Sequence, residues 1–574
     1  MPEPTEILKR YFGYDAFRPG QKELAEALLS GSDALGIMPT GAGKSICFQV
    51  PALVREGTAL VISPLISLMK DQVSALTQAG VPAAYLNSSL TPRQQELALA
   101  RARAGQYRLL YAAPERLSAP SFMAFAREAP LSLIAVDEAH CVSQWGQDFR
   151  PDYLKIADFV ESLPVRPPVG AFTATATRRV RDDIVRLLRL RDPRTVTTGF
   201  DRENLFWDVL TPKNRFAALL SLLRSMADRS GIVYCNSRKN VESVAKKLSE
   251  RGFSAVRYHA GLTEEERRRA QEDFQFDRAS VMVATNAFGM GIDKSNVGYV
   301  IHYNMPRSIE AYYQEAGRAG RDGEAADCVL LYSRQDIMAA RYLMDNAPPN
   351  PALSEDEQRQ VRRGDLERLN RMIRYCETKN CLRAELLGYF GQQAPARCGG
   401  CAHCLGSRFA FALSARDEGR ARPQKAPLPE TLPPEKEDLL VRLKARRLTL
   451  SQQLRVPPYI ICDDRTLRGI ADAAPTTREA LLRVKGMGEA KAARYGESLL
   501  SVVRDFLRIH PELSGEEVAP EDDPAPWPEE PSKPLWTEEM SLLMGRCLKA
   551  GLTVGQMAVV LDCPAEEITR RLPK

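Results

Sequence analysis

Short apolar segments alternate with amphipathic stretches of helical length from Asp33 to about Thr198, and the alternation begins again at Gly231. Apolar runs separated by helix-sized segments are typical of βαβ units, whose parallel strands are buried on both faces. The pattern therefore predicts two tandem α/β domains. From about Gln335 the apolar spacing becomes helical and ends in a cysteine cluster. The expected strands are 34–38, 59–63, 108–112, 133–136 and 169–173, then 231–235, 255–258, 281–285, 299–302 and 328–332.

The composition is that of an ordinary globular protein. A chain of 574 residues has room for roughly four domains of about 150 residues each. With 44% hydrophobic and 26% charged residues, collagen-like, fibrous and wholly disordered chains are excluded. The net charge of +6 permits polyanion binding but does not establish it. Because the chain starts without an apolar leader and has no run of about 18 apolar residues, we expect a soluble cytoplasmic protein.

A glycine-rich segment follows the first expected strand. It reads Met38-Pro-Thr-Gly-Ala-Gly-Lys-Ser45, with a methionine where the strict phosphate-loop pattern has glycine. Backbone N–H groups of such a loop close around phosphates, and the lysine and serine suit the β/γ-phosphates and Mg²⁺. An ordinary glycine turn is the alternative. The segment favours an ATP site formed by Thr40, Gly41, Ala42, Gly43, Lys44 and Ser45.

Two adjacent carboxylates, Asp137 and Glu138, follow the apolar run 133–136. In phosphoryl transfer one carboxylate holds Mg²⁺ and another orients or deprotonates the attacking water, which here assigns the metal to Asp137 and the water to Glu138. The alternative is a solvated acidic loop. A phosphate loop upstream in the same parallel sheet favours the catalytic interpretation.

A third element lies late in the second domain, where Gln314-Glu-Ala-Gly-Arg-Ala-Gly-Arg-Asp-Gly323 places two arginines three residues apart. Arg318 and Arg321 can reach across a cleft between the domains and neutralise charge on the γ-phosphate. A basic surface helix is the other interpretation of this segment taken alone.

The cysteines predict a metal site in a reducing compartment rather than a disulfide framework. Cys398, Cys401 and Cys404 lie at three-residue steps, and Cys381 precedes them on a basic helical segment. Four thiolates suit a closed tetrahedral Zn²⁺ site with a structural role. His403 and Cys376 are competing ligands.

Together these motifs resemble the RecQ family of superfamily 2 DNA helicases over residues 5 to 404. The resemblance rests also on Phe12-Gly-Tyr-Asp-Ala-Phe-Arg-Pro-Gly-Gln21, Ile62-Ser-Pro-Leu-Ile-Ser-Leu-Met-Lys-Asp-Gln72, Tyr111-Ala-Ala-Pro-Glu-Arg116, Thr173-Ala-Thr-Ala176 and Ala284-Thr-Asn-Ala-Phe-Gly-Met-Gly-Ile-Asp293. It implies two RecA-like domains that hydrolyse ATP with Mg²⁺, and a zinc module.

The resemblance also implies individual roles. Tyr14 and Arg18 would sandwich the adenine ring, and Gln21 would bind its edge. An aromatic face and a guanidinium plane form a stacking clamp of this kind. Arg321 resembles the arginine finger, with Arg318 and Gln314 lining the same cleft. A loop after the acidic motif couples single-stranded DNA to hydrolysis through Trp145, Phe149 and Arg150. The zinc ligands would be Cys381, Cys398, Cys401 and Cys404.

Beyond the zinc module the chain departs from the family pattern, because a proline-rich linker stands where a winged-helix domain is usual. Residues 435–510 then resemble an HRDC domain, in which a turn at Gly486 and Gly488 is surrounded by cations at 483, 485, 491 and 494. We expect an auxiliary site for single-stranded DNA there, with a protein-contact domain as the alternative. The last forty residues predict a small helix-turn-helix, with a packing or partner-docking bundle as the alternative.

The expected organisation is α/β and then helical. It comprises RecA-like domain 1 (1–200), RecA-like domain 2 (201–335), a helical zinc-binding module (336–405), a linker (406–434), an HRDC-like domain (435–510), an acidic proline-rich linker (511–534) and a helix-turn-helix-like tail (535–574).

The resemblance implies a DNA helicase that moves 3′→5′ in replication, recombination, repair and the SOS response. Its partners would be single-stranded and tailed duplex DNA, with repair or single-strand-binding proteins in addition, and it would be a monomer in the cytoplasm at the nucleoid. An RNA helicase is one alternative, since helicases across the superfamily share the two RecA-like domains. A DNA-binding or annealing scaffold that uses ATP only as a switch is another, against which the complete catalytic set argues.

Overall fold

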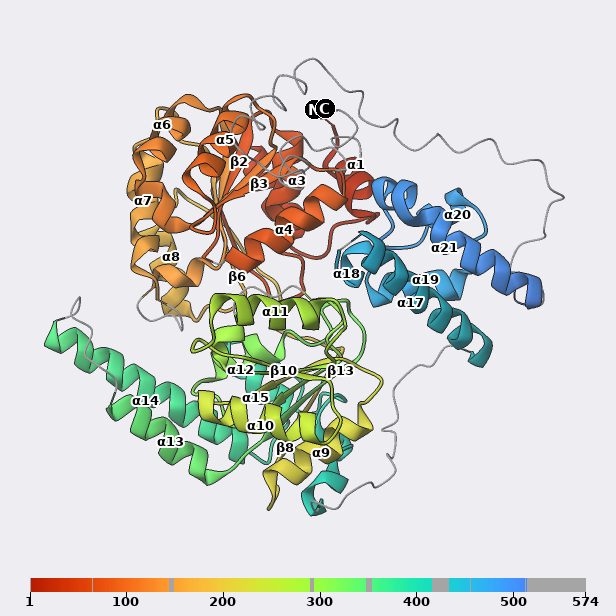
Figure 1. Cartoon of the computed structure of the whole chain (residues 1–574). Helices are drawn as coiled ribbons and strands as arrows, with labels where there is room; N and C mark the ends of the chain where they lie inside the picture. Colours follow the sequence, from red (N-terminus) through yellow and green to blue (C-terminus); the bar gives the residue numbers. More distant parts are fainter. Residues whose placement is uncertain are drawn as a thin grey trace, which may run out of the picture. The chain divides into compact units, whose positions relative to one another are not determined.

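The first α/β domain is built on a seven-stranded parallel sheet (Figure 1). The structure is a computed structural model that describes residues 2–513 except 65, 144–148, 290–293, 347–353, 416–432, 455 and 511–512. The strand order is β3-β4-β2-β5-β6-β1-β7. The strands are β1 (Ala34–Ile37), β2 (Thr58–Ile62), β3 (Ala83–Leu86), β4 (Leu109–Ala112), β5 (Leu131–Val136), β6 (Val169–Thr173) and β7 (Arg194–Thr197).

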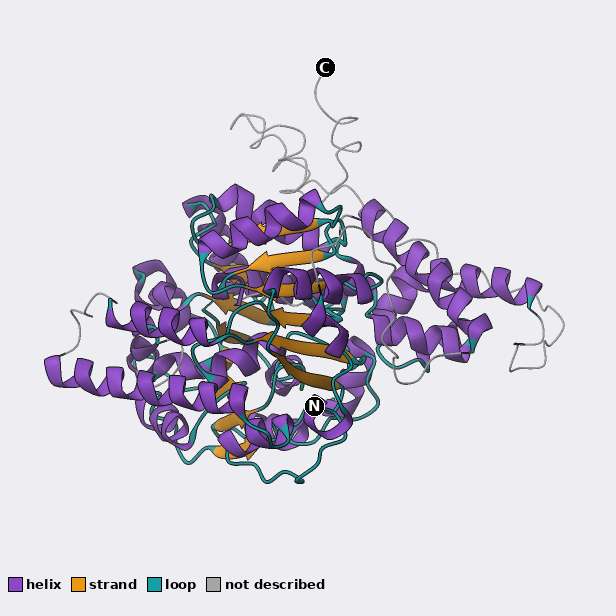
Figure 2. Ribbon diagram, turned by 90° about the horizontal axis from the view of Figure 1, so that it is seen from below, coloured by secondary structure: helices purple, strands orange, loops and turns teal. Residues whose placement is uncertain are grey.

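This topology brings distant motifs together. Only β6 separates β1 from β5, and all three strands run parallel, so the segments after Ile37 and Val136 emerge at one edge of the sheet. The central strands are apolar and buried on both faces because helices flank them (Figure 2). The helices are α1 (Pro4–Ile7), α2 (Gln21–Leu29), α3 (Ile46–Val54), α4 (Ile66–Gln78), α5 (Pro92–Arg103), α6 (Pro120–Glu128), α7 (Lys155–Glu161) and α8 (Arg178–Leu187).

The second α/β domain has a six-stranded parallel sheet in the order β10-β11-β9-β12-β13-β8. Its strands are β8 (Leu205–Leu210), β9 (Gly231–Tyr234), β10 (Ala255–Tyr258), β11 (Val281–Ala284), β12 (Tyr299–His302) and β13 (Ala326–Leu331). Its helices are α9 (Arg215–Ser225), α10 (Arg238–Glu250), α11 (Glu264–Gln275) and α12 (Ile309–Ala316). The two predicted sheets are confirmed.

Three strands were not expected from the sequence. β3 and β7 are edge strands of the first sheet, and their side chains are mostly exposed or half-buried, so their apolar signal is weak. β8 is buried, but Asp208 interrupts its apolar run. This carboxyl accepts a hydrogen bond from the Ser407 hydroxyl, which satisfies a polar group that burial would otherwise penalise.

Two helical regions follow the sheets. The first contains α13 (Arg334–Asp345), α14 (Glu355–Glu377), α15 (Leu382–Tyr389) and α16 (Ala402–Leu405). The second contains α17 (Pro434–Leu454), α18 (Pro458–Ile461), α19 (Asp464–Ala473), α20 (Arg478–Leu482) and α21 (Glu489–Ile509), and it has an apolar core of its own that includes Leu443, Ile470 and Tyr495. The predicted tail at 535–574 lies outside the described residues. No described helix is long and apolar enough to cross a membrane.

Candidate nucleotide and zinc sites

The phosphate loop connects β1 to α3. Gly41 and Gly43 have φ angles of +83° and +79°, in the left-handed region that glycine adopts without strain. The Lys44 ammonium donates a hydrogen bond to the Met38 carbonyl at 3.3 Å, so the lysine folds back over the loop. Burial lowers the pKa of Lys44, while Glu138 and Asp137 act in the opposite direction. The loop has the geometry of a phosphate cradle with one cation inside it.

The segment before α2 braces this loop. The Gln21 amide donates to the carbonyls of Ala42 at 2.9 Å and Gly43 at 3.0 Å, and its oxygen accepts from the Arg18 backbone N–H. The Arg18 guanidinium donates to the Gly41 carbonyl at 2.6 Å. In this structure Gln21 therefore supports the phosphate loop, and its role at the adenine edge stays a prediction.

The acidic pair lies directly after β5. The Ser63 hydroxyl is 3.4 Å from Asp137, and the His140 Nδ1 is 3.3 Å from the Glu138 carboxylate. Glu138 has a φ of +47°, an uncommon and strained backbone for a residue with a side chain. Burial and the charge of Glu138 raise the pKa of Asp137 to about 7. The pKa of Glu138 is lowered despite its burial, because His140 and Lys44 stabilise its carboxylate.

A single cavity of about 410 Å³ joins the predicted nucleotide residues of both domains. Lys44, Asp137 and Glu138 line it from the first domain, and Arg318 and Arg321 line it from the loop after α12. The same cavity is lined by Tyr14, Arg18, Gln21, Thr40, Gly41, Gly43, Ser45 and Gln314. Residues that are up to about 300 positions apart in the sequence thus surround one space large enough for a nucleotide.

Four residues of the C-terminal helical region also line this cavity, and the sequence did not predict this. They are Asp463, Lys485, Gly486 and Lys491. Three of them belong to the glycine turn for which single-stranded DNA was expected, or lie next to it. The sequence shows a glycine turn with basic neighbours, but it does not show which part of the chain lies opposite that turn.

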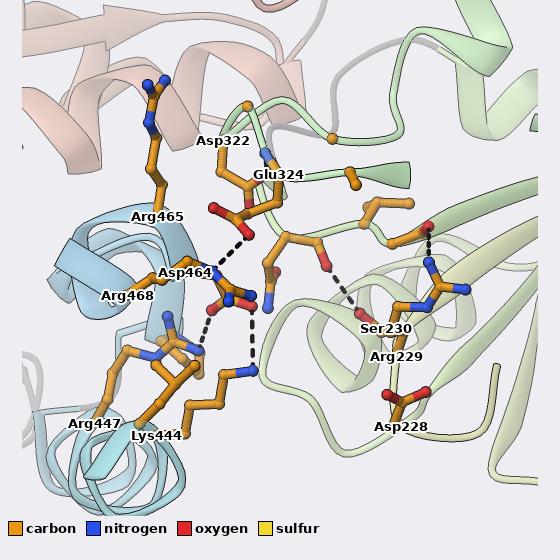
Figure 3. A pocket seen from close by; sticks show the side chains of 18 of the residues that line it. Asp228, Arg229, Ser230, Asp322, Glu324, Lys444, Arg447, Asp464, Arg465 and Arg468 are labelled. Carbon is orange, nitrogen blue, oxygen red and sulfur yellow. Dashed lines mark hydrogen bonds and ion pairs between the residues drawn. The ribbon is translucent and has the colours of Figure 1, made fainter. Parts of the chain in front are cut away.

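A larger cavity of about 1230 Å³ lies between the second α/β domain and the C-terminal helices (Figure 3). Charged side chains pair around it: Arg468 lies 2.8 Å from Glu324, and Arg447 lies 2.7 Å from Asp464. This cavity contains no part of the phosphate loop or of the acidic pair. Polar and charged side chains from the helical region and the sheet domain line this larger cavity, and the smaller cavity remains the candidate nucleotide site.

The predicted zinc ligands come together. The sulfur atoms of Cys381, Cys398, Cys401 and Cys404 all lie within 4.8 Å of one another. The sulfur atoms of Cys381 and Cys401 are 3.8 Å apart, and those of Cys398 and Cys404 are 4.0 Å apart. A tetrahedral site with Zn–S bonds of about 2.3 Å has sulfur atoms about 3.8 Å apart, so the cluster fits this metal.

Backbone hydrogen bonds to the cysteine sulfur atoms support the thiolate form of the cluster. Backbone N–H groups of Ala384 and Gly400 donate to the sulfurs of Cys381 and Cys398 at 3.4 and 3.3 Å. Such donors stabilise negative charge on metal-bound sulfur. Neither competing candidate is in the cluster. His403 Nδ1 is hydrogen-bonded to the Asn380 carbonyl, and Cys376 is buried in the apolar core.

Comparison with known families agrees with this geometry. Residues 18–184 match the DEAD/DEAH box helicase family, 214–323 the helicase conserved C-terminal domain, 334–405 the RecQ zinc-binding family and 436–503 the HRDC domain. The ATP-dependent DNA helicase RecQ of Bacillus subtilis (strain 168) is 36% identical over 591 residues, covering 88% of this chain and 98% of that protein. This chain belongs to the RecQ family. The predicted resemblance is confirmed, and with it the assignment of ATP and Zn²⁺ as ligands.

Other relatives are similar to a smaller part of the chain. The RecQ-like DNA helicase BLM of Xenopus laevis is 38% identical over 426 residues, covering 71% of this RecQ-family chain and 31% of that protein. A solved structure of Mss116p bound to single-stranded RNA and AMP-PNP shares the fold, with a TM-score of 0.50 and 16% identity, covering 65% of this chain and 86% of that chain.

The alignment with the Bacillus relative contains gaps in this chain. The alignment spans 591 positions, more than the aligned 88% of this 574-residue chain, so the relative has residues without counterparts here. Among the residues that the structure describes, every strand lies between Ala34 and Leu331. Outside residues 416–432, which the structure does not describe, the helices after residue 405 follow the zinc module without an intervening strand.

The predicted DNA-coupling loop is described only at its end. Trp145 lies outside the described residues. Phe149 is half-buried, and Arg150 donates a hydrogen bond from its guanidinium to the Pro64 carbonyl at 2.9 Å. Pro64 belongs to the segment after β2, so Arg150 links two loops at the same edge of the first sheet.

The HRDC turn contacts the N-terminal segment of the chain. The Gly486 N–H donates to the Gly13 carbonyl at 3.1 Å, and the Lys9 ammonium donates to the Leu482 carbonyl at 3.2 Å. Arg494 and Tyr495 are hydrogen-bonded to the Gln78 side chain. In this structure the turn makes contacts within the chain, and both its expected role as an auxiliary site for single-stranded DNA and the protein-contact alternative stay predictions.

Proposed function

We propose that this RecQ-family protein is an ATP-dependent DNA helicase that hydrolyses ATP between its two α/β domains and moves 3′→5′ along single-stranded DNA. The observation that carries the proposal is the single cavity that joins Lys44, Asp137 and Glu138 to Arg318 and Arg321. Each step of phosphoryl transfer has a side chain of suitable chemistry in this cavity.

The roles follow from charge and position. Lys44 and the loop amides bind the β/γ-phosphates, and Glu138 orients the attacking water. Arg321 stabilises the charge that develops on the γ-phosphate, with Arg318 beside Glu138. Asp137 and Ser45 are oxygen donors suited to Mg²⁺. When bound, this ion neutralises phosphate charge, and the raised pKa of Asp137 indicates a buried carboxylate that would gain from a cation there.

We further propose that Phe149 and Arg150, with Trp145, couple the DNA strand to the cleft. The DNA-binding loop and the acidic pair lie close along the chain, and Tyr153 donates a hydrogen bond to the Asp137 carbonyl at 2.9 Å. A DNA strand that displaces this loop would therefore displace the acidic pair as well. The biological setting in this proposal is recombination and repair, at the nucleoid.

The direct test uses two DNA duplexes that differ only in the polarity of their single-stranded tail. ATP-dependent opening of the 3′-tailed duplex alone is expected, and Glu138→Gln serves as the inactive control. Opening of the 5′-tailed duplex alone would refute the polarity. Hydrolysis that DNA stimulates without any strand separation would refute the helicase and leave a translocase.

The RNA helicase alternative has a separate test, because the shared two-domain fold does not distinguish DNA from RNA. ATP hydrolysis is compared with DNA and RNA oligonucleotides of one sequence. Stronger stimulation by DNA supports the proposal, and stronger stimulation by RNA overturns it.

For the zinc module, Cys401→Ser should give zinc-poor, poorly soluble protein, since structural Zn²⁺ contributes directly to folding.

A further inference from the structure

Arg202 lies in the segment that connects the two α/β domains, between β7 and β8. No motif of the sequence drew attention to it. Its side chain is half-buried, and burial lowers its pKa. A guanidinium that is withdrawn from water needs hydrogen-bond acceptors for its five N–H groups. The acceptors of Arg202 therefore show which parts of the chain it connects.

All five N–H groups of Arg202 have an acceptor. Nη1 donates to the Thr40 carbonyl at 2.5 Å and to the Gly317 carbonyl at 3.3 Å. Nη2 donates to the carbonyls of Ala319 at 3.0 Å and Gly320 at 2.7 Å. Nε lies 3.3 Å from the amide oxygen of Asn204. The four backbone acceptors are neutral, so the pattern is a geometric match to two loops rather than an ion pair.

The two loops are those that carry the proposed catalysis. Thr40 belongs to the phosphate loop of the first domain, and Gly317 to Gly320 surround Arg318 and directly precede Arg321. A Cβ atom on Gly41 would lie 3.1 Å from Arg202 Nη1 and 3.6 Å from the Arg321 Cα. The phosphate loop, the guanidinium and the arginine loop are thus in direct contact.

The connecting segment is fixed to the second domain on both sides of Arg202. The Tyr313 hydroxyl donates to the Phe200 carbonyl at 2.6 Å, and the Phe200 ring stacks on Phe390 at 4.6 Å. The Asn204 amide donates to the carbonyls of Gly320 at 2.9 Å and Glu324 at 2.7 Å. Arg202 therefore moves with the arginine loop, and its bond to Thr40 is the contact that reaches the other domain.

We propose that Arg202 is a positioning residue for ATP hydrolysis, which sets the placement of Arg321 relative to the phosphate loop by bonding both loops at once. The inference rests on the proposed role of Arg321. When the domains separate, the bond to Thr40 breaks while the bonds to Gly317, Ala319 and Gly320 remain. Arg202 thereby links closure of the cleft to assembly of the catalytic set.

Arg202→Gln is the first variant, and ATP hydrolysis is measured at saturating single-stranded DNA. We expect kcat to fall about 10- to 100-fold, because a misplacement of about 1 Å has effects of this size. The KM for ATP should stay within about threefold, because Lys44 and Arg18 keep their contacts with the phosphate loop. Arg202→Lys should recover part of kcat, since an ammonium has three donors where the guanidinium has five.

The control is Arg229→Gln. Arg229 is also a half-buried arginine of the second domain, with bonds to the Gly298 carbonyl at 3.2 Å and to Asp327 at 2.9 Å, and these acceptors lie outside the phosphate loop and the arginine loop. This variant should lower the melting temperature and leave kcat unchanged. If Arg202→Gln and Arg202→Lys likewise lower only the melting temperature, Arg202 has a merely structural role and the inference is wrong.

A double-mutant cycle separates the two proposals. If Arg202 acts through Arg321, the substitution Arg202→Gln should change kcat less than about threefold in an Arg321→Ala background. The full 10- to 100-fold loss in that background would overturn the inference. Wild-type turnover by Arg321→Ala would refute the proposed finger itself, whereas a slow Arg321→Ala protein beside a normal Arg202→Gln protein would overturn only the role of Arg202.

Discussion

Two glycine turns of this protein have similar sequences and different surroundings. The phosphate loop contains Gly41 and Gly43 and precedes α3, while the HRDC turn contains Gly486 and Gly488 and precedes α21. Both carry a lysine, and both contain a glycine in the left-handed region. The first turn surrounds a cavity, whereas the Gly486 N–H donates to the Gly13 carbonyl. An amide that already has a backbone acceptor is not available to a phosphate.

The close fit at the second turn explains this difference. A Cβ atom on Gly13 would lie 2.7 Å from the Gly488 nitrogen, so the two backbones approach as closely as glycine allows. At the phosphate loop the neighbouring group is the Gln21 side chain, 2.6 Å from a Cβ on Gly43. A glycine turn can therefore serve a ligand or a neighbouring chain segment, and what faces its amides decides which.

The largest expected effect separates the lysines of the two turns. Lys44→Ala should lower ATP hydrolysis at least 10²- to 10³-fold, because it removes a cation aimed at the phosphates. The protein should stay folded, as burial already lowers the pKa of this ammonium and limits its contribution to stability. Steady-state hydrolysis and a thermal melt check both statements.

Lys485→Ala is the matched control. Lys485 lines the same cavity from the HRDC turn, and its carbonyl accepts a hydrogen bond from the Thr466 hydroxyl. Hydrolysis should stay within about fivefold of wild type, since the lost side chain is not part of the phosphate loop. Equal losses for the two lysines would mean that both turns bind nucleotide phosphate.

An intermediate effect is expected from a methyl group in each turn. Gly43→Ala places a side chain at a φ of +79° and against Gln21, and it should lower kcat/KM for ATP about 10- to 100-fold. Gly488→Ala has an ordinary φ of −88° and a nearest contact of 3.2 Å to the Arg10 carbonyl. We expect near-normal hydrolysis and a slightly lower melting temperature for this second variant. The reverse order would contradict the assignment of the first turn.

The sequence predicted residues better than it predicted their neighbours. Lys44, Asp137 and Glu138 could be found because each follows a buried strand in one parallel sheet, and the cysteines because their spacing fits a metal. Arg202 could not, because its backbone acceptors lie 115 to 162 residues away, on loops of two domains. The contact of Gly486 with Gly13 is equally non-local. Such contacts depend on tertiary packing, which local patterns do not encode.

A third prediction concerns pH at the contact between the HRDC helices and the second domain. Burial and the charges of Asp464 and Asp463 raise the pKa of Asp322 to about 7, and Glu324 on its own loop adds to the effect. The protonated form is therefore favoured when the protein is folded. The stability that this proton contributes is present below the ordinary pKa near 4 and is lost as the pH rises through 7.

Melting temperatures between pH 5.5 and 8.5 test this prediction. The wild-type protein should lose stability mainly between pH 5.5 and 7, by about 2 kcal/mol from Asp322, because about 1.4 kcal/mol is lost for each pH unit below the raised pKa. Asp322→Asn should reduce that loss because the amide does not ionise, and a loss that belongs to Asp137, whose pKa is also raised to about 7, should remain. Asp472→Asn, which alters an exposed carboxyl at the same cavity, should leave the slope unchanged. Parallel slopes for Asp322→Asn and wild type would exclude Asp322 as the titrating group.

The smallest effect is expected from the ion pair beside the HRDC turn. Arg10 and Glu489 lie 3.8 Å apart, and both side chains are more than half exposed. Solvent screens such a pair, so Glu489→Gln should change the free energy of unfolding by less than about 0.5 kcal/mol. The backbone bond from Gly486 to Gly13 and the close approach of the glycines should then account for most of the contact. A change of several kcal/mol in the free energy of unfolding that disappears at high salt would show instead that charge holds the HRDC turn against the N-terminal segment. In that case raised ionic strength would release the turn, and its backbone amides could then bind a phosphate.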